Sequence, residues 1–318
     1  MEPAWRPAAR IEQLRQRAEL LARVRRFFAE RGVWEVDTPQ LSATAIADPN
    51  IESVAAELAG RRYWLQSSPE AAMKRLLAAG SGSIYQICHA FRGGERGRLH
   101  NVEFTLLEWY RVGFDHHALM DEVVDLAAML LGERPRERMS YREAFLRHAG
   151  IDPFALDAEG FAARAAEWDM AVPDLGADID AWRDLFFSYR VAPALGRGRY
   201  SFVDEFPASQ AALARLHRDE QGDLVAERFE LFIDGIEIAN GYHELTDPDE
   251  QRQRFRAEAE RREIRGEPLP DLDERLLAAL AAGLPDCAGV ALGLDRLIML
   301  ALGAERLDEV MAFPFERA

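Results

Sequence analysis

The chain has 318 residues, 48% apolar and 30% charged, which is enough apolar material for a substantial core in one large domain or two ordinary ones. Its 39 Lys and Arg residues against 55 Asp and Glu residues give a net charge of −16. That balance argues against non-specific electrostatic binding to nucleic acid or to an anionic membrane. It remains compatible with a basic partner, or with a small anionic ligand held by a few local arginines.

The cysteine content and the N-terminal segment indicate a cytoplasmic protein. Cys88 and Cys287 form no disulfide framework, metal cluster or CxxC pair. The first residues, "MEPAWRPAAR", lack the apolar core of a signal peptide. The apolar stretch "VALGLDRLIMLAL" is interrupted by Asp295 and Arg296, so it falls short of the ~18 residues of a membrane span.

The first third of the chain predicts two helices and three strands. Apolar residues at helical spacing predict a helix over residues 10–31, and "VWEVDTP" predicts a short strand that ends at Pro39. A second helix is expected between Pro69 and Gly80. Two strands, residues 83–92 and 102–111, flank the glycine-rich loop "GGERGRLHN".

Helical patterns then dominate from residue 119 to about 191, and strands return after them. One strand is expected over residues 200–207, and a hairpin over 227–244 turns at Asp234-Gly235. Asp247 caps a further helix, and "GVALG" is a strand that leads directly into the helix "LDRLIMLALG". Strands joined by hairpins, with helices grouped between them, predict an α+β fold with a largely antiparallel sheet.

The hairpin around the glycine-rich loop mixes both signs of charge. Glu108 and Tyr110 share one face of the second strand, in a segment where both faces carry acids and bulky apolar groups. We therefore expect Glu108 in an enclosed cleft, the alternative being an ordinary ion pair with an arginine. Arg92 stands where the glycines begin, a suitable position for a guanidinium that forks onto a phosphate. The loop residues Arg96, Arg98 and His100 either close over a polyphosphate or are simply solvated.

Two further segments indicate a nucleotide site. Arg296 lies in the first turn of its helix and opposes the helix dipole, so it predicts anion binding or base stacking unless Asp295 compensates it. Glu237 and Glu244 are seven residues apart, and a bulge at Asn240-Gly241 could bring both into one site. Two carboxylates near arginines predict Mg²⁺ bridging phosphates. The alternative is two exposed acids on an acidic protein.

Together these segments resemble the class II aminoacyl-tRNA synthetases. Residues 17–39, ending in "GVWEVDTP", resemble motif 1; residues 84–111, with "FRGGERGRLHNVEFTLLE", resemble motif 2; and residues 289–303, beginning "GVALGLDRL", resemble motif 3. "SSPEAAMKRLL" and "GIEIANGYHELTDP" are similar to the lysyl branch. Because motif 1 begins almost at once, with no anticodon-binding barrel before it, the chain resembles most the branch of ligases that modify elongation factor P.

The resemblance implies one catalytic domain over residues 1–318, with a six-stranded antiparallel sheet flanked by helices, in a homodimer joined at motif 1. It also implies an ATP-dependent ligase. (R)-β-Lysine would be activated as an adenylate and then transferred to the ε-amino group of a lysine on elongation factor P. Stable tRNA binding and membrane association are not expected. Positioning and charge neutralisation would supply most of the rate acceleration.

Carried over residue by residue, the resemblance implies three groups of site residues. The lysine pocket would consist of Ser68, Pro69, Glu70, Glu108, Tyr110 and Glu244. The ATP site would consist of Arg92, Gly93, Gly94, Asn101, Glu237, Ile238, Gly293 and Arg296. Glu237 and Glu244 would hold Mg²⁺.

Two positions depart from the related sequences. Gly94 stands where motif 2 usually has a glutamate that approaches the adenine amino group, and Glu95 is the candidate replacement. If Glu95 does not already reach adenine, restoring the glutamate at residue 94 should tighten ATP binding. Ala291 stands where lysyl-tRNA synthetases have glycine, and by strand alternation it faces the same side as Gly293. Its methyl group would crowd an α-amino group, which makes Ala291 a candidate determinant of specificity for β-lysine.

Two other functions stay open at this point. One is a small lysyl-tRNA synthetase that acts on tRNA, against which the charge of −16 and the missing anticodon domain count. The other is a catalytically silent paralogue that binds without catalysis, and Gly94 is the only feature in its favour. A related possibility is an amide ligase that acts on free amino acids with the same core, which only the identity of the acceptor excludes.

Overall fold

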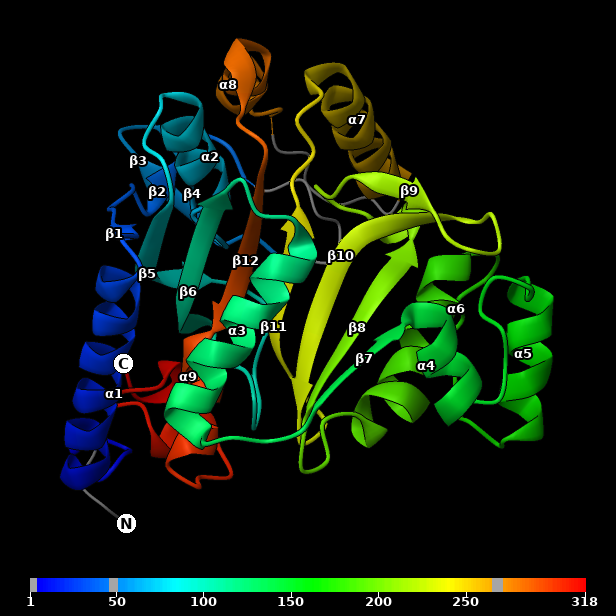
Figure 1. Ribbon diagram of the computed structural model, residues 1–318, viewed down its shortest axis with the longest axis horizontal. Helices are drawn as coiled ribbons and strands as arrows, with labels where there is room; N and C mark the ends of the chain where they lie inside the picture. Colours follow the sequence, from blue (N-terminus) through cyan, green and yellow to red (C-terminus); the bar gives the residue numbers. More distant parts are fainter. Residues whose placement is uncertain (1–4, 46–50, 265–270) are drawn as a thin grey trace. The chain divides into compact units, whose positions relative to one another are not determined.

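The computed structural model describes residues 5–45, 51–264 and 271–318, which divide into two compact units (Figure 1). Unit 1 contains residues 1–133 and 244–318, and unit 2 contains residues 134–243. Among the described residues, no helix combines the length and the apolar character needed to cross a membrane.

Unit 1 is built on four strands in the order β1-β5-β6-β12. The strands β5 (Ile84–Phe91), β6 (Glu103–Val112) and β12 (Cys287–Gly293) pair antiparallel, and the short β1 (Trp34–Glu35) pairs parallel with β5. A small second sheet, which the sequence did not predict, consists of β2 (Leu41–Ser42), β4 (Arg61–Leu65) and β3 (Ala55–Leu58). Its strands are only two to five residues long, too short to leave a clear alternation pattern.

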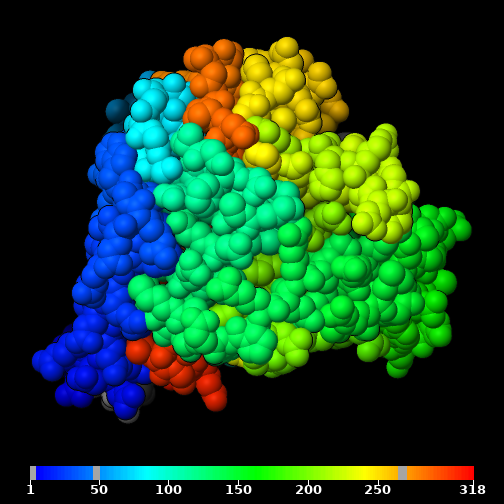
Figure 2. Space-filling model, viewed as in Figure 1, coloured from blue at the N-terminus to red at the C-terminus, as the bar shows by residue number. Residues whose placement is uncertain are grey.

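Six helices within the described residues belong to unit 1. They are α1 (Ile11–Glu30), α2 (Glu70–Ala78), α3 (His116–Leu131), α7 (Pro248–Ile264), α8 (Glu274–Gly283) and α9 (Leu294–Ala301). α3 covers the face that bears Trp109, whose indole N–H donates to Glu122 at 3.1 Å. The space-filling view shows α1 and α3 forming this outer surface of unit 1 (Figure 2). Because side chains alternate along β6, Glu108 and Tyr110 point to the opposite face.

Unit 2 contains strands in the order β11-β10-β8-β7, with β9 beside β10. Their bounds are β7 (Arg136–Ser140), β8 (Tyr200–Pro207), β9 (Leu216–Arg218), β10 (Leu224–Ile233) and β11 (Ile236–His243). The helices are α4 (Tyr141–His148), α5 (Ala158–Glu167) and α6 (Ile179–Phe186). Aromatic side chains from α4, α6 and β8 fill the core, where the rings of Tyr141 and Phe187 stack at 5.4 Å.

Helices dominate residues 119–191 as expected, but the sequence did not predict the strand β7 among them. Its sequence, "RERMS", has four polar residues and one apolar one, so the alternation typical of a strand is hidden. The strand forms because it pairs parallel with β8 from Arg136 to Ser140 and buries Met139. This is a non-local pairing that local patterns do not reveal.

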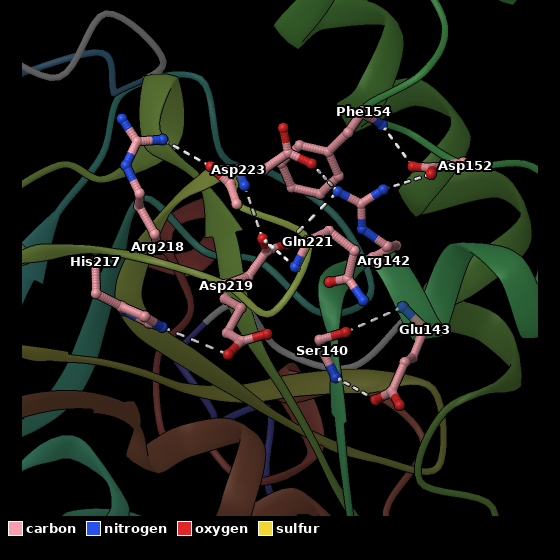
Figure 3. A network of polar contacts seen from close by, with 12 residues as sticks. Ser140, Arg142, Glu143, Asp152, Phe154, His217, Arg218, Asp219, Gln221 and Asp223 are labelled. Atoms are coloured by element: carbon pink, nitrogen blue, oxygen red, sulfur yellow. Dashed lines mark hydrogen bonds and ion pairs between the residues drawn. The ribbon is translucent and has the colours of Figure 1, made fainter.

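Arg142, at the beginning of α4, has three acidic neighbours (Figure 3). Arg142 forms ion pairs with Asp152 and Asp223, and its guanidinium lies 3.5 Å from the carboxylate of Asp219. The ring of Phe154 lies beneath the guanidinium, 4.4 Å from ring centroid to Cζ. These contacts tie α4 to the turn between β9 and β10 within unit 2.

The predicted α+β class with a large, mostly antiparallel sheet is confirmed. Over the described ranges, three long antiparallel strands lie in each unit, and the sequence predicts all six; a seventh predicted strand, "VWEVDTP", forms only the two-residue β1. The turn at Asp234-Gly235 is also confirmed, with positive φ at both residues. The bulge was predicted at the wrong place: residues 240 and 241 pair regularly, and the additional residue is Ile238. A single catalytic domain stays a prediction.

Candidate functional site

A buried acidic pocket lies on the face of β6 opposite α3. Glu108 is 2% exposed, and one of its carboxylate oxygens accepts a hydrogen bond from Ser68 at 2.7 Å. The other accepts from the hydroxyl of Tyr110, also at 2.7 Å. Ser68 is itself fixed because its Oγ accepts from the backbone N–H of Glu70 at 3.0 Å. Glu108 is therefore held by hydroxyl donors from two elements, and the alternative of an ordinary arginine ion pair is wrong.

Two more carboxylates reach the same pocket, and a lysine joins them. The ammonium group of Lys74 on α2 lies 2.6 Å from Glu70 Oε1 and 2.5 Å from Glu244 Oε2. Glu244 is 1% exposed, and its backbone N–H donates to the carbonyl of Cys287 at 3.0 Å. The structure thus brings together the predicted residues Ser68, Glu70, Glu108, Tyr110 and Glu244. Pro69 precedes the first residue of α2 as its N-cap.

Lys74 is a pocket residue that the sequence analysis missed. The available signal was its spacing, because a glutamate followed by a lysine four residues later on a helix places both side chains on one face. That pattern is common on solvated helices, whereas here the Lys74 side chain is only 2% exposed.

Gly289 on β12 was also missed, and it is what makes room for two pocket side chains. A Cβ atom placed on Gly289 would lie closer than 3.0 Å to the ring of Tyr110 and to Glu244 Oε1. The backbone of Gly289 pairs directly with that of Tyr110. Close approach of neighbouring groups explains a glycine inside this strand.

The ionisation of the pocket reflects its burial. Desolvation, followed by the negative charge of Glu70, raises the pKa of Glu108 to about 8, although the hydrogen bonds from Ser68 and Tyr110 act in the opposite direction. Glu244 adds to the increase. Burial, and after it the charge of Glu108, also raises the pKa of Tyr110, so its hydroxyl stays a donor.

A second group of predicted residues lies at the start of the loop between β5 and β6. The guanidinium of Arg92 lies 3.2 Å from Glu95 and 5.1 Å from the ring of Phe104. Its Nε is buried and has no hydrogen-bond partner among the described residues. An unsatisfied buried donor of this kind suits an anionic ligand.

Gly93 and Gly94 lie against a residue that the sequence analysis did not consider. The backbone N–H of Gly93 donates to the carbonyl of Glu52 at 2.8 Å. A Cβ at Gly93 would lie 2.6 Å from the carboxylate of Glu52, and one at Gly94 would lie 3.1 Å from it. Glu95 meanwhile faces Arg92. A carboxylate thus stands beside Gly94, although it comes from outside motif 2.

The helix α9 carries two charged residues with different roles. Arg296 donates from Nε to the carbonyl of Leu99 at 3.2 Å, and its other end lies 2.7 Å from His100 Nε2. Asp295 does not compensate Arg296. It forms a buried ion pair with Arg17 of α1 at 2.5 Å and accepts from the backbone N–H of Thr105 at 2.6 Å. The predicted motifs 1, 2 and 3 therefore meet at Asp295.

Three other predicted residues have defined surroundings in unit 1. Asn101 donates to the carbonyl of Glu103 at 2.6 Å and accepts from the backbone of Phe315 at 3.0 Å, so its amide fixes the loop. Ala291 pairs with Glu108 across β12 and β6, and Gly293 pairs with Leu106. Gly289, Ala291 and Gly293 share the pocket face by alternation.

The remaining predicted residues, Glu237 and Ile238, belong to unit 2. Ile238 is the additional residue of the bulge opposite Leu231 and Phe232. The partly buried Arg228 donates to Asn240 at 3.2 Å and pairs with Glu230 at 2.5 Å. Burial raises the pKa of Glu230 to about 7 against the effect of Arg228, and the charge of Glu237 adds to the increase.

Comparison with known proteins gives the class first. The family of class II tRNA synthetases for D, K and N matches residues 4–317, and the chain belongs to this family. Among curated relatives, it is 48% identical over 321 residues to the elongation factor P–(R)-β-lysine ligase of Salmonella typhi, covering 99% of this chain and 98% of that protein. The ligases of the same name from Yersinia enterocolitica and Vibrio vulnificus are each 49% identical, covering 99% of this chain and 98% and 99% of those proteins, respectively.

Proposed function

We propose that this protein activates (R)-β-lysine with ATP and transfers it to the ε-amino group of a lysine on elongation factor P. The observation that carries the proposal is the pocket of three carboxylates within a synthetase fold: Glu108 and Glu244 are buried, and Glu70 is partly buried. The high identity to ligases of that name, over nearly their whole length, supports the same substrate and acceptor.

The pocket suits a substrate with positively charged amines. Glu108, with Ser68 and Tyr110, offers one ammonium site, and Glu244, with Glu70, offers carboxylates for another. Buried carboxylates need a compensating positive charge, since an isolated buried charge is costly. A lysine substrate supplies that charge while its own carboxylate remains available for reaction.

Arg92, Phe104 and Arg296 are assigned to the nucleotide. Arg92 would bind the α-phosphate through its unsatisfied Nε, where it neutralises charge as the substrate carboxylate attacks and pyrophosphate leaves. Phe104 presents an aromatic ring on the same face of β6 as Glu108, and the absence of a side chain at Gly293 leaves room beside the backbone for a base. Arg296 would stack on that base or reach the terminal phosphate.

Mg²⁺ would neutralise the phosphates, and carboxylate oxygens are suitable ligands for it. Glu237 stays a predicted ligand, and its charge, like that of Glu230, acts on Arg228 within unit 2. Glu244 stays a predicted second ligand, but its contact with the Lys74 ammonium at 2.5 Å favours a role in the amine pocket. A homodimer joined through α1 also stays a prediction.

The proposal is tested by incubating the protein with ATP, Mg²⁺, purified elongation factor P and each lysine isomer in turn. We expect the intact mass of the factor to increase by one lysyl residue, faster with (R)-β-lysine. Lysine-dependent pyrophosphate exchange measures the first step alone. A protein that neither exchanges pyrophosphate nor modifies the factor would be a silent paralogue, and the proposal would fail.

A further inference from the structure

Lys74 lies in the middle of the amine pocket, although neither step of the proposed reaction needs it. It extends from α2, its side chain is 2% exposed, and its ammonium contacts both Glu70 and Glu244. α2 is nine residues long, and Lys74 is on its buried face with Met73 and Leu77. A lysine is rarely buried this completely unless acids accompany it.

The two acidic neighbours of Lys74 favour the charged form of its ammonium group. Desolvation, the largest effect, would lower its pKa, but Glu244 and then Glu70 outweigh it and raise the pKa above the ordinary value. A lysine in that state is no nucleophile or base, since both roles require the neutral amine. Lys74 therefore acts through its charge.

The charges of the pocket can be counted. In the substrate-bound pocket, where an ammonium group keeps Glu108 ionised, Glu70, Glu108 and Glu244 contribute −3 and Lys74 contributes +1, so the sum is −2. A lysine substrate with both amines protonated brings +2 into the pocket, and its reacting carboxylate is turned to the nucleotide. The filled pocket is then neutral, the condition under which buried charges cost least.

We propose that Lys74 is an internal counter-ion that sets the charge of the pocket side chains to −2 when substrate is bound, and so selects substrates with two ammonium groups. The inference rests on the proposed function, since it concerns the same substrate. Lys74 is a positioning residue that holds Glu70 and Glu244. Without it the pocket would carry one surplus carboxylate, which would repel its neighbours or take up a proton.

Two single variants and their double variant, compared by lysine-dependent pyrophosphate exchange, test the inference. Lys74→Met gives a pocket charge of −3, Glu70→Gln gives −1, and the double variant restores −2. We expect each single change to lower kcat/KM for lysine by about tenfold or more, and the double variant to exceed both single variants. Glu70→Gln combined with Met73→Leu is the matched control, because it alters the same helix without restoring the charge.

Norleucine, which has one ammonium group in place of two, provides a second measurement that does not depend on how well Lys74→Met folds. The preference for lysine over norleucine should fall in Glu70→Gln by about tenfold. Combining that change with Lys74→Met should restore the preference.

Additive losses in the double variant, with an unchanged preference in Glu70→Gln, would reduce Lys74 to a packing residue and overturn the inference. These results differ from a failure of the proposed function. In that case the parent protein itself would show no lysine-dependent exchange.

Discussion

Glu108 is a carboxyl group whose ionisation the fold controls through its neighbours. Ser68 and Tyr110 donate to it, and Glu70 and Glu244 act on it from α2 and from the residue that follows β11. The thiol of Cys88 on β5 is a further neighbour, since Glu108 helps to raise the pKa of that thiol to about 12. Every acidic neighbour favours the protonated form of Glu108, and an incoming ammonium favours the ionised form.

The raised pKa of Glu108, about 8, predicts a pH dependence. In the free protein Glu108 is protonated below that pH, so lysine binding must release a proton there. We expect kcat/KM for lysine in pyrophosphate exchange to increase as pH rises from 6 to 8. Glu108→Gln should lower kcat/KM and abolish its increase between pH 6 and 8. An identical profile in the variant would show that another group titrates.

The raised pKa of Glu108 also makes the free energy of unfolding depend on pH. An acid whose pKa is higher in the folded than in the unfolded protein binds more protons when folded between the two values. The contribution of Glu108 to the free energy of unfolding therefore decreases as pH rises from about 4.5 to about 8. Substrate binding should offset that loss.

Substitution of Ala291 tests why the protein would prefer β-lysine over α-lysine. Ala291 pairs with Glu108 across β12 and β6, so its methyl group borders the carboxylate that we assign to an ammonium. Ala291→Gly should improve activation of α-lysine relative to β-lysine by about tenfold, the order expected for one methyl group in a tight pocket. The measurement is pyrophosphate exchange with both isomers, and an unchanged ratio of kcat/KM values would remove Ala291 from the account.

At the scale of elements, the loop between β5 and β6 gives a different expectation for residue 94 from the one the sequence suggested. A glutamate placed there would meet the carboxylate of Glu52, which lies 3.1 Å from the Cβ position. We now expect Gly94→Glu to weaken ATP binding, whereas the uncharged control Gly94→Gln should weaken it less. Adding Glu52→Gln to Gly94→Glu should recover affinity. Tighter ATP binding by Gly94→Glu alone would restore the earlier expectation.

The ion pair between Arg17 of α1 and Asp295 of α9 joins two helices through a nearly buried contact, with side-chain exposures of 16% and 3%. Arg17→Met leaves the Asp295 carboxylate without its cation and should lower the free energy of unfolding by about 3 kcal/mol. Arg15→Met is the control, because its ion pair with Glu12 is exposed and should contribute less than about 1 kcal/mol. Urea denaturation of both variants checks the difference, and equal stabilities would contradict it.

Local patterns predicted the long elements well and the non-local ones poorly. β8 and the strands around the glycine-rich loop are eight to ten residues long and rich in apolar residues, so their positions followed from the sequence. β7 depends on pairing with β8, and the bulge at Ile238 depends on the register with β10, which no single segment contains.

The same distinction holds for the site. The carboxylates Glu108 and Glu244 could be predicted because charged residues within apolar strands are conspicuous. Lys74 and Gly289 could not be predicted. The role of a lysine on a helix or of a glycine in a strand depends on its neighbours in the folded protein, which the local sequence does not reveal. Glu52 was hidden for a related reason, since it reaches motif 2 from a distant segment.

At the scale of the whole molecule, we propose that the activated lysine is transferred to a protein. The net charge of −16 disfavours association with another polyanion such as tRNA, and long-range repulsion of this kind acts mainly on the rate of encounter. A synthetase fold alone does not decide the acceptor, since function lies in the site and its partner.

The most direct measurement offers both acceptors in one reaction. The protein, ATP, Mg²⁺ and (R)-β-lysine are incubated with equal amounts of elongation factor P and lysine tRNA at about 150 mM salt, where non-specific binding to nucleic acid is weak. The factor is then weighed by mass spectrometry and the tRNA assayed for acylation. We predict that the mass of the factor increases by one lysyl residue while the tRNA stays uncharged. Acylated tRNA together with unmodified factor would contradict the proposal that elongation factor P is the acceptor.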